Sequence, residues 1–408
     1  MASQLPVAFS AAAADRVLDR GEGVVRLAPT WVPRVFSTPG RRLRLHPDDY
    51  YAFGKDRGGI DERWLASPIR ADNGPSTGEF EGLSLVVDAE GALLPFDQFI
   101  DHHGAGLVSE RIWDDYGKWP VFAKFFDNEQ ALPFHVHHRD EHAIPLGKVS
   151  KPEAYYYAPQ MNNHLAAHPV SFLGLQPHVT REQLKERLVW FGRGGDNRIT
   201  ELSLGYRTRL GTGWDVPAGV LHAPGSACTY EPQAASDVLC MCESWSNNRE
   251  VPDELLWKDT PANRVGDLDY ILDLLDWEVN VDPDFVRNRQ LIPYETAESA
   301  ADDSSYVEKW IVYKSPMFSA KELTVPPGAT ATISDADAYG AIVVQGHGSF
   351  GVHDAAAATL IRFGDLTEDE FFVSADAARR GVRITNRSSV EPLVVLKHFG
   401  PGTAPLVG

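Results

Sequence analysis

The chain has 408 residues, of which 43% are hydrophobic and 23% are charged, as in ordinary globular proteins of about two or three domains. With 38 basic and 57 acidic residues, the net charge of −19 argues against binding to nucleic acid or to an anionic membrane surface. Ten Trp, 13 Tyr and 19 Phe exclude a mainly disordered chain, while 34 Gly and 28 Pro favour short strands over long helices.

The cysteines and the N-terminal sequence bear on the cellular location. Cys228, Cys240 and Cys242 are too few for a disulfide framework, which favours a reducing compartment. The first residues lack a basic region followed by an apolar run, and no apolar stretch reaches about 18 residues. We therefore predict a cytoplasmic protein without a membrane span. Cys240-Met-Cys242 has a metal-ligand spacing, but its apolar neighbours favour a buried strand.

In chain order, four segments are predicted. Residues 1–50 form an Ala-rich lead-in, and residues 51–250 form a metal-binding β domain. A helical insertion is expected near 178–191, since Thr180 can cap a helix and apolar residues then recur at helical spacing. Leu-rich residues within 251–300 predict a helical connecting segment, and the apolar runs within 301–408 predict a second, metal-free β domain.

A weak internal repeat links the two β domains. Residues 216–222, which read Val-Pro-Ala-Gly-Val-Leu-His, resemble residues 373–379, which read Val-Ser-Ala-Asp-Ala-Ala-Arg. If the repeat is real, the chain holds two similar β domains. The second would then have Arg379 where the first has His222.

The densest group of candidate metal ligands lies in residues 133–142, which read Pro-Phe-His-Val-His-His-Arg-Asp-Glu-His. His135 and His137 are two residues apart, so both imidazoles face the same side of a strand and supply half of a metal site. Glu153 follows 153 − 137 = 16 residues later, within reach of a hairpin, and His222 follows a Pro-Ala-Gly turn. Three imidazoles and one carboxylate suit Zn²⁺, with Fe²⁺, Mn²⁺ and Ni²⁺ as alternatives.

The competing interpretation is a His-rich surface loop, in which His138 and His142 are solvated or structural. Other polar residues near the motif have two interpretations as well. Lys151 shares a strand face with Glu153 and either holds an anionic oxygen and relays a proton or is an ordinary exposed lysine. Glu243 and Arg249 either line the same pocket or end a strand in solvent. Four tryptophans are candidates for stacking on a sugar ring, although core packing is favoured for each: Trp64, Trp113, Trp119 and Trp245.

These motifs resemble those of a known family, the type I phosphomannose isomerases of the cupin superfamily. Phe134-His-Val-His-His-Arg-Asp-Glu-His-Ala143 followed by Lys151-Pro-Glu153 is similar to the family's metal motif. Residues 115–127, 172–183 and 216–223 are similar to its preceding strand, its helical insertion and the segment with its last ligand. The likeness covers most of residues 50–250, in the family's order.

The resemblance implies a mostly β fold with helical insertions, arranged as a double cupin of two β-barrels or jelly rolls. It further implies that the first barrel binds a metal through His135, His137, Glu153 and His222, with Lys151 in the pocket. Two departures stand out. The family usually has Gln where this chain has His135, and residues 243–249, Glu-Ser-Trp-Ser-Asn-Asn-Arg, replace the segment with its substrate-binding Arg.

We therefore expect a metal-dependent aldose–ketose isomerase that acts on a small sugar or sugar phosphate through a cis-enediolate, with the metal as Lewis acid. Lys151, Glu243 and Arg249 are the candidate catalytic residues, and the base is Lys151, Glu243 or His138. The substrate is of the mannose 6-phosphate type or an unphosphorylated relative. The alternatives are a non-catalytic sugar-binding cupin and another metal-cupin enzyme, such as an epimerase or a dioxygenase.

Overall fold

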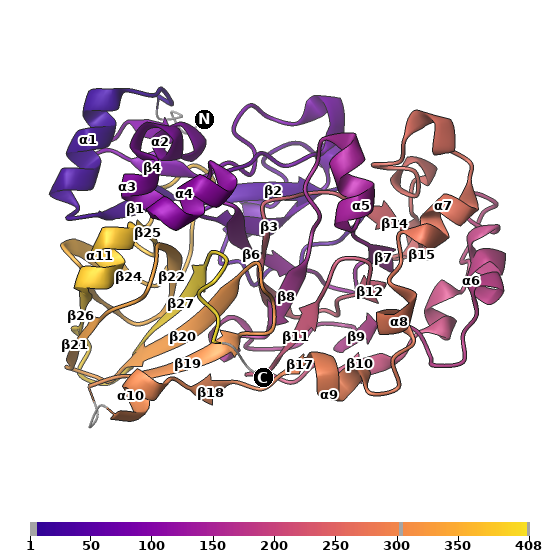
Figure 1. The fold of residues 1–408 in the computed structure, drawn as a ribbon. Coiled ribbons are helices and arrows are strands. Elements are labelled where there is room, and N and C mark those ends of the chain that lie inside the picture. Colours follow the sequence, from indigo (N-terminus) through magenta and orange to yellow (C-terminus); the bar gives the residue numbers. More distant parts are fainter. Residues whose placement is uncertain (1–5, 302–304, 406–408) are drawn as a thin grey trace.

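The computed structural model describes residues 6–301 and 305–405, which form two layered β units lying side by side (Figure 1). Within these residues no helix is long and apolar enough to cross a membrane. The prediction of a mostly β fold with helical insertions is confirmed.

The first unit consists of a seven-stranded and a five-stranded antiparallel sheet, with an apolar core between them. The larger sheet has the order β17 (Gln290–Leu291), β11 (Gly213–Val216), β8 (Glu153–Tyr156), β13 (Cys228–Ala234), β6 (Val121–Asp127), β3 (Gly59–Leu65) and β2 (Thr30–Arg34). The smaller sheet has the order β10 (Gly205–Arg207), β9 (Val170–Leu173), β12 (His222–Ala223), β7 (His135–Val136) and β14 (Cys240–Met241).

The second unit consists of a nine-stranded and a four-stranded sheet around a separate apolar core. The larger sheet has the order β18 (Tyr294–Glu295), β19 (Val307–Val312), β20 (Ser319–Val325), β27 (Leu393–Phe399), β22 (Tyr339–Gln345), β25 (Glu370–Val373), β1 (Val24–Ala28), β4 (Leu85–Val87) and β5 (Leu93–Pro95). The smaller sheet has the order β21 (Thr330–Ile333), β26 (Val382–Asn386), β23 (His347–Phe350) and β24 (His353–Ala356).

The two units share one strand plan. The eight consecutive strands β6–β13 and β20–β27 pair with one another in the same order in both units. No sheet of the described residues closes on itself, so the closed barrels of the double-cupin prediction are not observed. Each unit is instead a sandwich of two open sheets.

Strand register corrects one detail of the predicted repeat. Val216 and Val373 end the equivalent strands β11 and β25, as the sequence match requires. After Val373, however, the chain forms helix α11 (Ala375–Arg380), which Ser374 caps, before β26 begins. Arg379 therefore lies on a helix, paired with Asp376, and does not take the place of His222. The physical reason is the Ala-rich, capped sequence of this segment, which favours a helix over a tight turn.

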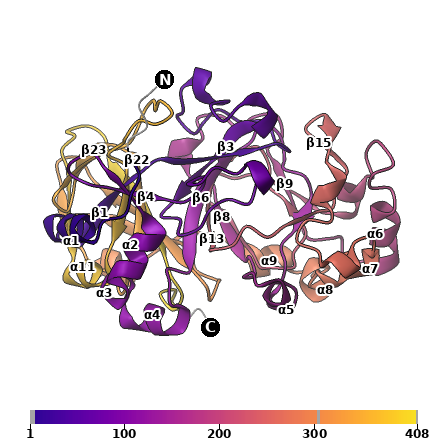
Figure 2. The same cartoon turned by 90° about the horizontal axis from the view of Figure 1, so that it is seen from above.

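The N-terminal segment joins both units. β1 pairs with β25 of the second unit, and β2 pairs with β3 of the first unit. Helices α1 (Ala11–Arg20), α2 (Phe96–His103), α3 (Ala105–Val108) and α4 (Glu110–Tyr116) lie beside the second unit (Figure 2). The boundaries of the four predicted segments stay predictions, but residues 24–34 already supply strands to two sheets.

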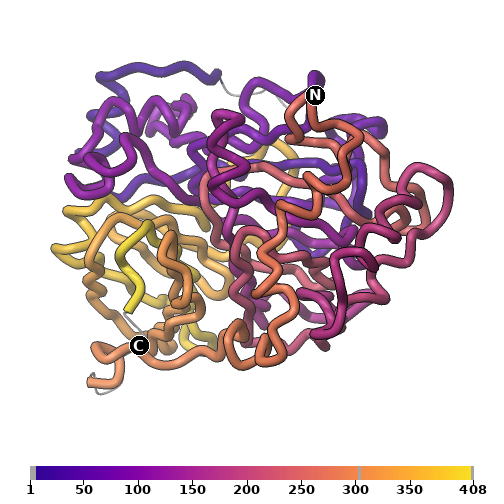
Figure 3. The backbone as a smooth tube through the Cα atoms, turned by 45° about the vertical axis from the view of Figure 1, so that its right-hand side comes forward, coloured from indigo at the N-terminus to yellow at the C-terminus, as the bar shows by residue number. Residues whose placement is uncertain are grey.

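Helices cover the outer face of the five-stranded sheet (Figure 1). The expected insertion is α6 (Arg181–Leu188), which begins at a capping box formed by Thr180 and Gln183. The Leu-rich segment forms α7 (Leu268–Asp273), and its leucines pack on the same outer core. Shorter helices are α5 (Asp140–Ala143), α8 (Trp277–Asn280), α9 (Phe285–Arg289) and α10 (Ala297–Ala301). After β17 the chain leaves the first unit and enters the second unit at β18, a path that can be followed in Figure 3.

Candidate metal centre

Three strands of the first unit carry the predicted ligands. His135 is the first residue of β7 and pairs with His222, the first residue of β12. Strand alternation puts His135 and His137 on the inner side of the sheet, while Phe134 and Val136 pack into the outer core. Glu153, the first residue of β8, faces them from the opposite sheet.

The three imidazoles converge on one point, and Glu153 lies against two of them; all four side chains are buried, none being more than 5% exposed. The ring centres of His135 and His222 are 4.0 Å apart, and that of His137 lies 5.0 and 4.9 Å from them. Nε2 of His137 lies 3.0 Å from Oε2 of Glu153, and Nε2 of His222 lies 3.1 Å from Oε1. The ligand nitrogens of the three histidines all lie within 4.8 Å of one another.

Backbone carbonyls fix the orientation of all three rings. Nδ1 of His135 lies 2.6 Å from the carbonyl oxygen of Pro133 and Nδ1 of His137 lies 2.7 Å from that of Val238. Nδ1 of His222 lies 2.8 Å from the carbonyl oxygen of Val220. Because a carbonyl only accepts, each Nδ1 carries the proton, and each Nε2 directs a lone pair toward the centre.

Nε2 of His222 therefore faces Oε1 of Glu153 at 3.1 Å without a proton between them, whereas the Lys151 ammonium lies 3.0 Å from Nε2 of His137 and from Oε2 of Glu153. Nε2 of His222 is buried and has no hydrogen-bond partner. Facing lone pairs at about 3 Å repel unless a cation lies between them. Three neutral imidazoles and one carboxylate are the donor set of a catalytic Zn²⁺ or Fe²⁺ site, so these residues suit a divalent metal ion.

The electrostatics keep the donors in their metal-binding forms. Burial, with the neighbouring imidazoles, lowers the pKa of His135 well below its usual value. Burial, with the Lys151 ammonium, lowers the pKa of His137 to about 3. Burial raises the pKa of Glu153, but Lys151 and the imidazoles outweigh it and hold that pKa well below the usual range. His135 and His137 are thus neutral and Glu153 is ionised at neutral pH.

Lys151 lies beside the predicted ligands. Its ammonium is 3.0 Å from Nε2 of His137 and 3.0 Å from Oε2 of Glu153, and its side chain is 5% exposed. The nearest sequence neighbour of the cluster, His138, points elsewhere, with Nε2 bonded to the backbone oxygen of Asp259 at 2.9 Å. Lys151 is therefore better placed than His138 to act at this centre.

Three residues around the cluster were not predicted from the sequence: Tyr155, Glu231 and Lys124. The Tyr155 hydroxyl donates to Oε1 of Glu153. The Glu231 carboxylate lies 3.8 Å from the Lys151 ammonium and 3.1 Å from that of Lys124. Burial and the nearby Glu153 raise the pKa of Glu231 to about 8. For Lys124 and Glu231, the sequence signal was a charged residue within a buried strand, because a buried charge is rarely present without a partner.

Glu243 lies apart from the cluster. Among the described contacts, no hydrogen bond or ion pair joins it to the four predicted ligands; its carboxylate accepts from the backbone N–H of Phe134 at 2.7 Å. Burial raises the pKa of Glu243 to about 7. Its catalytic role stays a prediction, since Phe134 faces the outer core and not the metal donors.

Replacing Glu243 with glutamine should change how stability depends on pH. A carboxyl whose pKa is raised from 4.5 to about 7 on folding stabilises the fold fully below pH 4.5 and loses this contribution as pH rises through 7. Such a rise in pKa corresponds to about 3 kcal/mol at most. Between pH 4.5 and pH 8, the free energy of unfolding measured in urea should fall less for E243Q than for the parent protein. E250Q changes an exposed residue and is the control, which should behave like the parent. Equal losses in both proteins would contradict the raised pKa.

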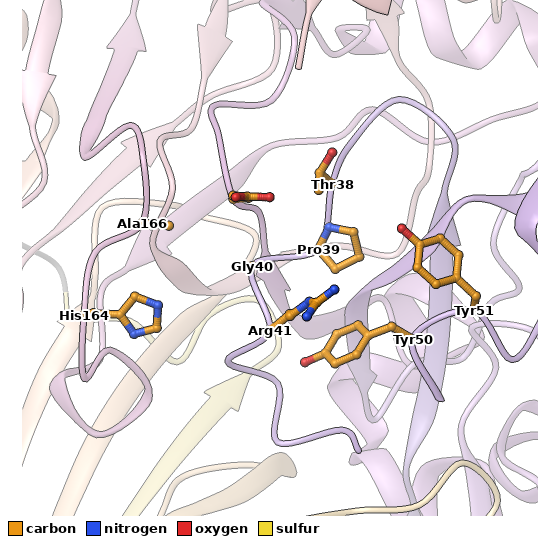
Figure 4. A pocket seen from close by; sticks show the side chains of 9 residues that line it. Thr38, Pro39, Gly40, Arg41, Tyr50, Tyr51, His164 and Ala166 are labelled. Carbon is orange, nitrogen blue, oxygen red and sulfur yellow. The ribbon is translucent and has the colours of Figure 1, made fainter. Parts of the chain in front are cut away.

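Arg249 also lies outside the cluster. It is exposed on β16 (Arg249–Glu250), where its guanidinium donates to the Ser37 carbonyl at 2.6 Å and to the Thr38 hydroxyl at 3.1 Å. Thr38 in turn lines a cavity of about 390 Å³, around which Arg41, Tyr50 and His164 lie (Figure 4). The substrate role of Arg249 stays a prediction.

The remaining sequence interpretations concern cysteines and tryptophans. Cys228, Cys240 and Cys242 are buried and free, as expected for core residues. Trp64 and Trp119 are fully buried, as predicted. The prediction of core packing is wrong for Trp245, which is 38% exposed. The reason is that Trp245 lies on the short hairpin of β15 (Trp245–Ser246) and β16.

In the second unit, other residue types occupy the positions equivalent to the predicted metal ligands. By strand register, Ile333, Asp335, Tyr339 and Val382 stand where the first unit has His135, His137, Glu153 and His222. The Lys397 ammonium, which is completely buried, contacts Asp335 at 2.6 Å and Glu308 at 2.5 Å. A second ammonium, that of Lys321, lies 2.7 Å from Asp335. This centre is thus a compact set of paired lysines and carboxylates.

No protein-family model matches the chain, and no curated protein matches it. Several solved structures, in contrast, match most of this chain. The mannose 6-phosphate isomerase of Bacillus subtilis is 14% identical with a TM-score of 0.58, over 92% of this chain and 99% of that one. A zinc-bound mannose 6-phosphate isomerase is 10% identical with a TM-score of 0.61, over 93% of this chain and 100% of that one. A mutant of the phosphomannose isomerase from Salmonella typhimurium is 10% identical with a TM-score of 0.60, over 93% and 100%.

The chain has the fold of the mannose 6-phosphate isomerases. The likeness extends over nearly the whole length of both chains, so it includes both β units and the helices between them. At this level of identity it establishes the fold alone.

Proposed function

We propose that the protein is a metal-dependent aldose–ketose isomerase, with its active site at the cluster of His135, His137, Glu153 and His222. The observation that carries the proposal is the close approach of three buried imidazoles and the Glu153 carboxylate, with Nε2 of His222 left without a hydrogen-bond partner. The fold shared with mannose 6-phosphate isomerases, one of them zinc-bound, supports this proposal and favours zinc. A divalent ion held there supplies Lewis acidity toward carbonyl and hydroxyl oxygens of a sugar.

The residues around the cluster supply the other requirements of the reaction. Isomerisation moves a proton between C1 and C2 of an open-chain sugar, by way of a cis-enediolate. The Lys151 ammonium, held by Glu153, donates to a substrate oxygen that gains negative charge. Burial of the centre keeps bulk water from the enediolate and strengthens these charged contacts.

Metal analysis and a substrate panel test the proposal together. Purified protein should contain about one divalent ion per chain and convert an aldose, with or without a phosphate, to its ketose. Sugar binding without conversion would identify a non-catalytic sugar-binding protein. Oxygen consumption by an iron-loaded protein, or inversion at one carbon without a ketose product, would identify an oxygenase or an epimerase.

Replacing Lys151 with methionine should lower kcat by about 10²–10⁴-fold and leave the metal in place, because general acid–base catalysis typically contributes that much. Turnover and metal content of K151M are measured on the same sample. K118M, which changes an exposed lysine, is the control and should match the parent. A K151M protein with full turnover would remove Lys151 from the mechanism.

A further inference from the structure

The five-stranded sheet of the first unit has a second polar site on its outer face. His222 directs its imidazole inward, so the next residue of β12, Ala223, faces outward. Ala223 pairs with Phe172 of β9, and both line a cavity of about 270 Å³. The sheet therefore separates this cavity from the metal centre.

The lining of the outer cavity is polar and without positive charge. Its lining residues are Gln130, Ala131, His168, Phe172, Thr200, Ala223, Glu243, Trp245, Ser246, Asn247 and Asn248. These described residues include no Lys and no Arg. Amides and hydroxyls donate to and accept from sugar hydroxyl groups, whereas Glu243 disfavours a phosphate or another anion.

A rigid hairpin presents an aromatic ring at this cavity. Asn247 and Asn248 have φ values of 52° and 59°, the left-handed conformation that a tight two-residue turn requires. The Asn247 amide donates to the Ala131 carbonyl at 3.0 Å and so ties the turn to the loop before β7. Trp245, the first residue of the hairpin, is 38% exposed and lines the cavity together with these polar groups.

Two buried polar atoms of the lining residues have no partner. They are Oδ1 of Asn247 and Nε2 of His168, whose ring stacks on Phe172 at 5.7 Å. A buried polar atom without a partner costs free energy, and a ligand hydroxyl could pair with it once the side chain turns toward the cavity. An exposed indole beside unpaired amide and imidazole atoms is complementary to a sugar, which has C–H groups on one ring face and hydroxyls around its edge.

We propose that this outer cavity is a binding site for a neutral sugar or polyol, distinct from the metal centre. Trp245 packs against the C–H face of the ligand, and Asn247, Asn248 and Gln130 pair with its hydroxyls. The absence of Lys and Arg among the described lining residues selects against phosphorylated sugars. The site is independent of the proposed isomerase activity, since the sheet lies between the two centres.

The test is a binding titration followed by tryptophan fluorescence and by ligand-observed NMR. Mannose, fructose, glucose and mannitol are the probes, with mannose 6-phosphate and adenosine for comparison. At least one neutral probe should bind, W245A should weaken it tenfold or more, and N247A should weaken it as well. W190A is the matched control, since Trp190 is 58% exposed and does not line the cavity.

The metal-centre variant H137A separates this proposal from the proposed function. Neutral-sugar binding retained in H137A and lost in W245A supports an outer site, whether or not the protein is an isomerase. Three results would overturn the proposal. They are equal weakening by W190A and W245A, loss of sugar binding in H137A with W245A unaffected, and binding of adenosine or mannose 6-phosphate without any neutral sugar.

Discussion

Replacing His137 with alanine should remove the bound metal and the aldose–ketose conversion together. His137 is one of the four proposed donors and is oriented by the Val238 carbonyl, so its loss would leave the proposed site with too few ligands. Metal stabilisation of a transition-state charge amounts to several kcal/mol, which corresponds to a rate loss of about 10³-fold or more. Elemental analysis and a ketose assay on one preparation measure both effects.

The matched control for this experiment is H142A. His142 lies in the same motif and is half-buried, but its ring contacts Tyr270 and not the metal donors. It should keep both metal and activity. An H137A protein that loses its metal and still converts the sugar would refute the Lewis-acid role. Retained metal in H137A would instead show that the remaining donors suffice.

Replacing Lys397 with methionine should lower the free energy of unfolding by about 3–5 kcal/mol. The change leaves Asp335 and Glu308 buried near each other with Lys321 as the remaining partner. Removing one member of a buried ionic group is costly because the charges left behind stay desolvated. Chemical denaturation measures the loss, and K309M, an exposed lysine on the same strand as Glu308, should change little.

The same cluster sets an expected response to acid. Burial raises the pKa of Asp335, but Lys397 and Lys321 outweigh it and hold the pKa below 3.8. Its stabilising contribution is therefore present above about pH 4 and is lost as the pH falls through the lowered folded value. K397M should begin to unfold at a higher pH than the parent during acid titration. Identical acid midpoints would show that Lys397 does not stabilise the ionised carboxylate.

Local sequence predicted those features that depend on spacing along one strand or helix. His135 and His137 had to share a face, and Thr180 had to begin a helix, because both follow from the periodicity of a single element. The convergence of Glu153 and His222 on this pair depends on pairing between distant strands, and it was found through motif likeness and turn residues.

The features that the sequence did not predict are those that depend on which strands face one another. Lys124 and Glu231 are charged residues within buried strands, and their pairing follows only from the register of β6 and β13. Arg379 was placed wrongly because seven matching residues do not show that a helix follows the strand. Trp245 was assigned to the core by its composition alone, whereas a two-residue asparagine turn holds it at the surface.

The duplicated strand plan gives the two halves of the molecule different dependence on their surroundings. In the second half, the positive charge that neutralises the buried carboxylates is Lys397, which is tethered to the backbone and cannot be diluted away. In the first half, Lys151 contacts Glu153 at 3.0 Å, and the proposed metal would add a second positive charge that comes from solution. The second half is therefore neutralised by its own side chains, whereas the first half, if the proposed site is right, binds its metal only where ions are supplied.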